Sequence, residues 1–129
     1  MKFNQNIVNI GLLGENLAVG YLLKNKYLIL FRNKKEGFDE IDIVAVRQDK
    51  TLVFFEVKSR MGLRGGDEVF LPEDNFSNKK KRRVARACMH FVVEHPDLVD
   101  GDEGWQIDLL AIRIEPGLKR FNLRHYRNV

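Results

Sequence analysis

The segment VFFEVKSR, residues 53–60, reads as a buried strand that ends in charged side chains. Strand side chains alternate between the two faces of a sheet, and the first three residues here are apolar on both faces. This pattern is typical of a central strand that is covered on both sides. Glu56 and Lys58 follow on one face at the C-terminal end of the strand. The segment therefore predicts a carboxylate and an ammonium group beside a buried surface.

The surrounding sequence supplies further elements of an α/β sheet. Hydrophobic spacing and turn residues predict a helix over 9–26, strands over 27–33, 38–47 and 51–58, a helix from Ser77 to about Glu94, and strands over 105–114 and 119–126. The short polar link at residues 48–50 predicts an antiparallel hairpin. The glycine-containing segment 59–76 predicts a loop that is either functional or partly mobile. The order of elements predicts one α/β domain over residues 1–129, with helices packed on a sheet.

Composition narrows the class of protein. The chain has 129 residues, of which 44% are hydrophobic and 31% charged, as in an ordinary globular domain. The net charge of +4 permits an acidic partner without requiring one. A single cysteine, Cys88, excludes an internal disulfide and a Cys-rich zinc site. No signal peptide and no stretch of about 20 apolar residues is evident, so we expect a cytoplasmic protein.

Two further carboxylates stand where apolar residues are expected. Asp42 lies between two isoleucines in the second predicted strand. The hairpin can make it a neighbour of Glu56 on one face, although the register cannot be read from the sequence. Glu15 lies in the apolar stripe of the first helix, where it needs a partner. A structural role for Glu15, as a buried ion pair or as a carboxylate at a helix end, is as good an explanation as a functional role.

The three carboxylates together indicate a metal site. Clustered carboxylates repel one another and lose hydration, so a cation is needed among them. Oxygen ligands without His or Cys suit Mg²⁺ or Mn²⁺. A metal held in this way can bind phosphate oxygens and lower the pKa of a bound water, and Lys58 stands next to it. We therefore expect catalytic roles for Asp42, Glu56, Lys58 and Glu15, with Asp42, Glu56 and Glu15 as metal ligands. The three histidines have no spacing typical of a metal site.

A basic helix supports an anionic partner. The segment SNKKKRRVARACMH, residues 77–90, has lysines in its first turn, where positive charge is unfavourable. A phosphate bound at this helix N-terminus would relieve the conflict. The expected nucleic-acid contacts are Lys79, Lys80, Arg82, Arg83, Arg86 and Arg60. A solvated basic face is the simpler alternative.

Four segments in the same order resemble a known family. GLLGENLAVGYLLKNKYLILFRN, EIDIVAV, LVFFEVKSR and WQIDLLAI are similar to the YraN family of predicted endonucleases. That family is similar to archaeal Holliday junction resolvases and has a restriction-endonuclease-like fold with a mixed sheet. The resemblance assigns the helix glutamate to Glu15, the metal aspartate to Asp42, the Glu-x-Lys pair to Glu56 and Lys58, the lysine of the second helix to Lys79 or Lys80, and the fourth-strand acid to Asp108. It also implies a homodimer.

Two functions follow as hypotheses. The first is a magnesium-dependent hydrolase, an endonuclease that cuts phosphodiester bonds in DNA, including branched or junction DNA. The alternative is a non-catalytic module on the same fold that binds nucleic acid or a protein. Asp108 either supports the site or, more simply, pairs with an Arg or Lys residue.

Overall fold

The structure, a computed structural model, describes residues 9–62, 77–117 and 119–129. Its elements are α1 (Ile10–Lys24), β1 (Leu28–Glu36), β2 (Asp39–Val46), β3 (Leu52–Met61), α3 (Asn78–Glu94), the short 3-10 helix η2 (Pro96–Leu98), β4 (Trp105–Ile114) and β5 (Phe121–Tyr126). The predicted order of helices and strands is confirmed. Within the described ranges, no helix is long and apolar enough to cross a membrane.

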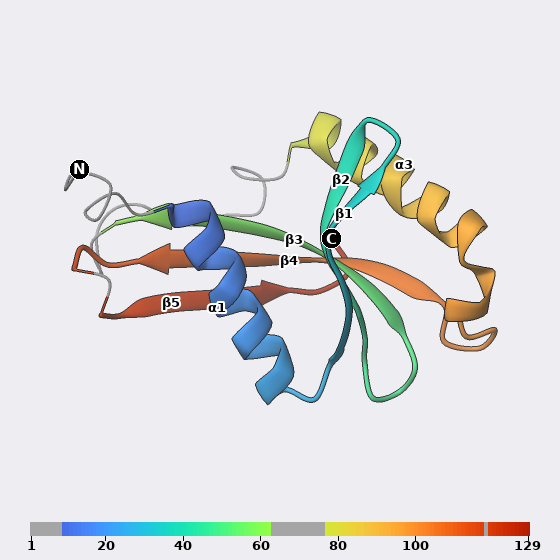
Figure 1. Ribbon diagram of the computed structural model, residues 1–129, viewed down its shortest axis with the longest axis horizontal. Coiled ribbons are helices and arrows are strands. Elements are labelled where there is room, and N and C mark those ends of the chain that lie inside the picture. The colour runs from blue at the N-terminus through green and yellow to red at the C-terminus, as the bar shows by residue number, and fades with distance from the viewer. Residues whose placement is uncertain (1–8, 63–76, 118) are drawn as a thin grey trace, which may run out of the picture.

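The strands form one mixed sheet in the order β1-β2-β3-β4-β5 (Figure 1). β2 pairs antiparallel with β1 and with β3, so the predicted hairpin is confirmed. β3 and β4 are parallel, because the chain crosses over through α3 between them, and β5 returns antiparallel to β4. This is the α/β sheet with packed helices that the order of elements predicted, and its mixed pairing is the one that the family resemblance implied.

Two strand ends differ clearly from the prediction: β1 continues to Glu36 instead of residue 33, and β3 continues to Met61 instead of residue 58. Residues 59–61 were expected in a loop, but they extend β3, whose pairing with β4 continues to Met61 opposite Ile114. The tertiary partner decides this boundary, because a parallel neighbour as long as β4 supplies hydrogen-bonding groups along the whole of β3. Residues 63–76, the rest of the predicted loop, lie outside the described residues.

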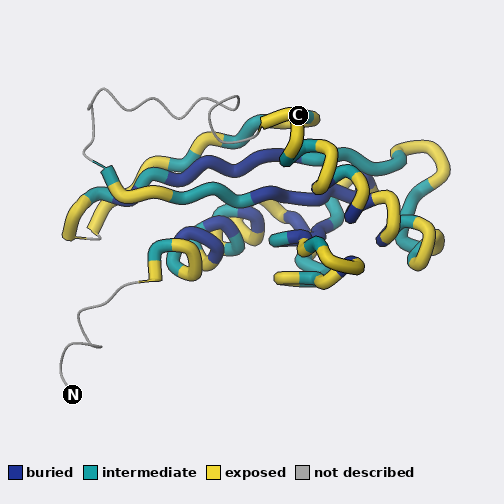
Figure 2. Tube along the Cα trace, turned by 90° about the horizontal axis from the view of Figure 1, so that it is seen from above, coloured by how far each residue is buried: buried dark blue, intermediate teal, exposed yellow. Residues whose placement is uncertain are grey.

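Each face of the sheet is covered by one helix. α1 packs with the cluster that includes Leu22, Ile43 and Phe55. α3 packs on the other face through Cys88 and Phe91, against β2, β3 and β4. Figure 2 shows the buried stretches along the middle of the strands and exposed residues at the turns. The central strand β3 is therefore apolar on both faces, as its sequence indicated.

Side-chain caps stabilise the N-terminus of each helix, and a glycine allows α1 to approach the sheet closely. Asn9 caps α1 by accepting a hydrogen bond at Oδ1 from the Leu12 backbone N–H at 3.0 Å. Ser77 caps α3 in the same way, with Oγ accepting from the Lys80 N–H at 3.2 Å. α1 approaches β3 closely at Gly14, where a Cβ would lie within 2.5 Å of the Ser59 side chain.

The sheet opens between β2 and β3. Their pairing runs from Val46 opposite Leu52 to Ile43 opposite Phe55, whereas β2 stays paired with β1 as far as Asp39. On the N-terminal side of Ile43, β2 is no longer paired with β3. Here the β1–β2 hairpin bends away from β3 and lies beside α3 (Figure 1). The Asp39 carboxylate of this hairpin forms a salt bridge with Arg86 of α3 at 3.1 Å. The separation of the two strands exposes their facing side chains to a cavity.

Candidate active site

Asp42 and Glu56 meet at the point where β2 and β3 separate. One step beyond the last paired residues, the register places Asp42 opposite Glu56. Asp42 Oδ2 accepts a hydrogen bond from the Val57 backbone N–H at 2.8 Å. This bond satisfies a β3 backbone donor at the point where the pairing of β2 with β3 has ended. Both carboxylates line a cavity of about 260 Å³. Its lining residues are Phe38, Asp39, Glu40, Asp42, Glu56, Lys80, Arg83 and Val84.

The surroundings of Asp42 oppose its ionisation. Burial and the neighbouring Glu56 carboxylate raise the pKa of Asp42 from 3.8 to about 7, although the hydrogen bond from Val57 lowers it. The Glu15 carboxylate on α1 raises this pKa a little further. A positive ion between Asp42 and Glu56 would remove the repulsion that holds the proton on the pair. The pair therefore favours the binding of a cation.

Two lysines lie at the carboxylate pair. Lys80 Nζ is 2.6 Å from Glu56 Oε2. Burial lowers the pKa of Lys80, but the hydrogen bond and charge of Glu56 outweigh burial, and the net direction is upward. The pKa of Lys58 is lowered by burial and by Lys80 beside it, against the attraction of Glu56 and Asp42. Lys58 is therefore within electrostatic reach of the pair, while Lys80 holds the direct contact.

Glu15 has partners of its own. Its Oε1 accepts hydrogen bonds from Arg32 Nε at 3.0 Å and from Asn33 Nδ2 at 2.9 Å. The buried ion pair that the sequence left open is thus present. Glu15 is not among the residues that line the cavity. It acts on Asp42 through its charge, from the α1 side of the sheet.

The basic residues of α3 lie on its exposed side. Lys79, Arg82, Arg83 and Arg86 are exposed, and Arg83 also lines the cavity. Their positive charge lies at the helix N-terminus and along the cavity edge, where an anionic strand could contact it. Arg60 is exposed near the end of β3.

The structure adds residues that the sequence did not single out. Glu40 precedes Asp42 by two residues and shares its cavity, a relation that strand alternation could have indicated. Glu36, His90 and Glu94 form a group that could hold a metal ion, since their ligand atoms lie within 4.8 Å of one another. Residues from β1 and α3 make up this group, which explains why spacing along the chain did not reveal it. In the structure Lys34 Nζ lies 2.8 Å from Glu36 Oε2.

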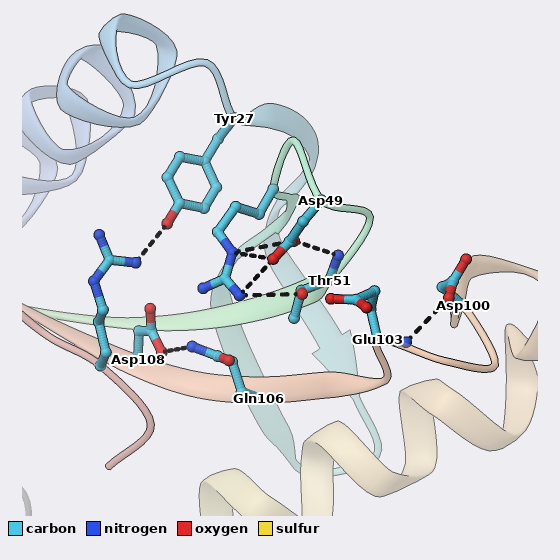
Figure 3. Close-up of polar contacts among 9 residues, drawn as sticks. Tyr27, Asp49, Thr51, Asp100, Glu103, Gln106 and Asp108 are labelled. Carbon is cyan, nitrogen blue, oxygen red and sulfur yellow. Dashed lines mark hydrogen bonds and ion pairs between the residues drawn. The ribbon is translucent and has the colours of Figure 1, made fainter.

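Asp108 belongs to a different network. It is fully buried and accepts hydrogen bonds from Gln106 Nε2 at 2.8 Å and from the Asn128 N–H at 2.9 Å (Figure 3 shows the first). A third contact joins it to His125 Nε2 at 2.7 Å. The expected Arg or Lys partner was wrong: the ion-pair partner is His125, whose Nδ1 lies 2.8 Å from Tyr21 OH of α1. Asp108 thus ties β4 and β5 to α1 and does not line the cavity.

The fold and the site together define a class of protein. The order and pairing of the elements define an α/β protein with a mixed five-stranded sheet and a helix on each face, and an acidic pair lies where β2 and β3 separate. Residues 14–112 match the Uncharacterised protein family UPF0102, and the chain belongs to this family. UPF0102 is the YraN family that the sequence resembles.

Similar proteins carry the same family name. A UPF0102 protein of Caldicellulosiruptor bescii is 40% identical over 90 residues, which cover 70% of this chain and 71% of that protein. Another, of Alkaliphilus oremlandii, is 31% identical over 119 residues, covering 92% and 95%. A solved EndoMS–dsDNA complex aligns with a TM-score of 0.43 at 13% identity, over 78% of this chain and 36% of that chain. A likeness of this size carries no argument about function, which depends on the site itself.

Proposed function

We propose that this protein is a metal-dependent endonuclease that hydrolyses phosphodiester bonds in DNA. The observation that carries the proposal is the pair of carboxylates, Asp42 and Glu56, held side by side in a cavity that Lys80 and Arg83 also line. A fold gains no stability from this arrangement, because burial and the Glu56 carboxylate oppose the ionisation of Asp42. Such a pair is typical of a site shaped for a cation and its ligand.

The donor set fits Mg²⁺ or Mn²⁺. Asp42 and Glu56 would hold the metal with hard oxygen ligands, and Glu15 would add negative charge from α1. The metal, when bound, supplies Lewis-acid polarisation of a phosphate oxygen and a lowered pKa for water. The Val57 N–H fixes the orientation of the Asp42 carboxylate. Residues outside the pair therefore preorganise it.

Lys58 is suited to the hydrolysis itself. In the reaction a water oxygen bonds to phosphorus, one bridging P–O bond breaks, and the leaving oxygen takes up a proton. Negative charge builds on the phosphate as this happens, and a fixed ammonium group beside it stabilises that charge. Because the pKa of Lys58 is lowered, it also releases a proton more readily than an exposed lysine.

Lys80 links the site to the basic helix. Its ammonium group lies against Glu56, on the first turn of α3. Phosphate binding at this helix N-terminus would attract Lys80 away from Glu56, which would free that carboxylate for a metal. Lys79, Arg82, Arg83, Arg86 and Arg60 would hold the remaining phosphates.

Cleavage assays test the proposal directly. Linear and branched DNA would be incubated with Mg²⁺ or Mn²⁺ and with wild type, Asp42→Ala or Glu56→Ala. We expect each variant to lose at least about 100-fold in cleavage rate, because several kcal/mol of transition-state stabilisation depend on the metal. DNA affinity should change little, and Asp102→Ala, an exposed acid elsewhere, should cut like wild type. Full cleavage by Asp42→Ala or Glu56→Ala would refute the site.

The non-catalytic alternative rests on one observation. The chain's own cations already neutralise two of the acids, with Lys80 at Glu56 and Arg32 at Glu15. A binding module would keep these pairs and use only the basic face of α3. It would bind DNA without cutting any substrate in any divalent metal.

A salt titration measures the contribution of the basic face under both hypotheses. Neutralising Lys79, Arg83 and Arg86 should weaken binding to DNA of any sequence. Removing one phosphate-binding cation should flatten the plot of log affinity against log salt by about 0.9. Arg86 should contribute least, because it is already paired with Asp39. An unchanged slope would mean that this face is only solvated.

The homodimer and a cytoplasmic location are part of the same proposal. The homodimer follows from the family resemblance alone, and the cytoplasmic location follows from the composition of the chain. Sedimentation equilibrium of the purified protein, with and without DNA, measures the first. Fractionation of cells that express the protein measures the second.

A further inference from the structure

Phe38 is the most exposed large apolar side chain among the described residues, with a relative exposure of 109%. It lies at the tip of the β1–β2 hairpin, between Glu36 and Asp39, which pair with each other. Gly37 before it has φ +64°, the conformation that lets a two-residue hairpin turn close. The turn is therefore tight, and its only large side chain projects into solvent.

The tip of this hairpin separates two cavities. Phe38 lines the cavity of about 260 Å³ that contains Asp42 and Glu56. It also lines a second cavity of about 200 Å³, formed with Arg86 and His90. Phe38 is thus a ridge between the carboxylate pair and a neighbouring hollow.

Each cavity has an arginine from α3 in its lining, together with carboxylates. Arg83 belongs to the first cavity and Arg86, which is paired with Asp39, to the second. The two arginines are three residues apart on α3, so they are neighbours on the helix surface. An exposed aromatic ring with an arginine in the cavity on each side suits a chain that alternates phosphates with flat bases. A protein partner would instead find a lone apolar residue among charges, which is a poor interface centre.

We propose that Phe38 is a stacking platform for an unpaired base of the DNA strand whose phosphate enters the carboxylate cavity. This inference rests on the proposed function and specifies its substrate class. Bases in a regular duplex are already stacked on each other, so their faces are not available to the ring. The site therefore prefers flaps, junction arms and single strands to blunt duplex DNA.

Binding assays with matched variants test this role. Affinity would be measured by fluorescence anisotropy in EDTA, so that no cleavage occurs, for a single strand, a flap and a blunt duplex. Phe38→Ala should weaken binding to the first two by about tenfold, the usual effect of losing one base–aromatic stack. Binding to the duplex should be nearly unchanged. The slope against salt should also stay the same, because no charge is removed.

Two control variants separate stacking from general damage. Phe38→Tyr keeps the ring and should keep the affinity for unpaired strands. Phe121→Ala removes another exposed phenylalanine, 49% accessible and on β5, and should behave like wild type. Because Phe38 is exposed, its removal should leave the free energy of unfolding unchanged.

The outcomes distinguish this inference from the proposed function. Equal affinity of wild type and Phe38→Ala for every DNA, or an equal loss on all three, would overturn the stacking role alone. The predicted pattern of binding, without cleavage by wild type in any metal, would support the stacking role while refuting the nuclease. A wild-type protein that binds no nucleic acid would overturn both.

Discussion

Replacing Asp42 by Asn tests whether the Asp42 carboxylate lowers the free energy of unfolding of the protein. Asn keeps the size of the side chain and an oxygen that can accept the Val57 N–H, but it cannot ionise. Burial and Glu56 hold the pKa of Asp42 at about 7, so its carboxylate is unfavourable in the folded protein. We expect Asp42→Asn to increase the free energy of unfolding in metal-free buffer above neutral pH.

The size of the effect follows from the pKa. At about 1.4 kcal/mol for each pKa unit, the difference between 3.8 and about 7 corresponds to about 4 kcal/mol. Burial of the Asn amide opposes this gain, so we expect a net increase of about 1–3 kcal/mol at pH 8. The folded state binds the Asp42 proton more tightly than the unfolded state. The contribution of Asp42 to the free energy of unfolding of the wild type therefore falls as pH rises from about 4 to about 7.

Urea denaturation at several pH values, with and without Mg²⁺, measures these changes. The advantage of Asp42→Asn should grow between about pH 4 and 7 and stay constant above that range. Mg²⁺ should stabilise wild type, because it binds the folded state, and should have little effect on the variant. Asp108→Asn provides a control of opposite sign. Burial raises the pKa of Asp108, but hydrogen bonds from His125, Asn128 and Gln106 lower it overall, so this variant should lose stability at neutral pH.

Two results would refute the reasoning. The first is a loss of stability in Asp42→Asn at pH 8 that equals its loss at pH 5. The second is stabilisation of wild type and Asp42→Asn by the same concentration of Mg²⁺. Either would mean that Asp42 is an ordinary structural carboxylate.

Further expectations concern packing, catalysis and thiol chemistry. Gly14→Ala should lower the free energy of unfolding by about 1–3 kcal/mol, because the added Cβ would clash with Ser59. Gly20 has open space around it, so Gly20→Ala should raise the free energy of unfolding by about 0.5–1 kcal/mol. Urea denaturation of both variants measures the two effects. Lys58→Ala should slow DNA cleavage by about 100-fold while leaving DNA affinity nearly intact, and single-turnover kinetics with a separate binding assay would expose a general binding defect instead. Burial strongly raises the pKa of the Cys88 thiol, so alkylation followed by mass spectrometry should modify it only after unfolding, and rapid modification of the native protein would contradict its burial.

The sequence determined the elements and the identity of the acidic pair. Alternation along residues 52–58 and the polar link at 48–50 depend on contacts between near neighbours, so the hairpin could be predicted. The Ser77 cap is likewise a local hydrogen bond, to the N–H three residues later. Asp42 and Glu56 stood out because each interrupts an apolar strand, and the hairpin restricts them to nearby positions.

The tertiary structure decided the partners of these residues. Arg32 lies 17 residues from Glu15 along the chain, and Lys80 reaches Glu56 only because α3 crosses over the sheet. The cavity exists because the N-terminal part of β2, residues 39–42, is separated from β3 and packs with β1 and α3. No periodicity in the chain records where two strands separate, since that point depends on how helices and strands pack around it. The sequence therefore determined which groups the site contains, and long-range packing determined which of them face one another.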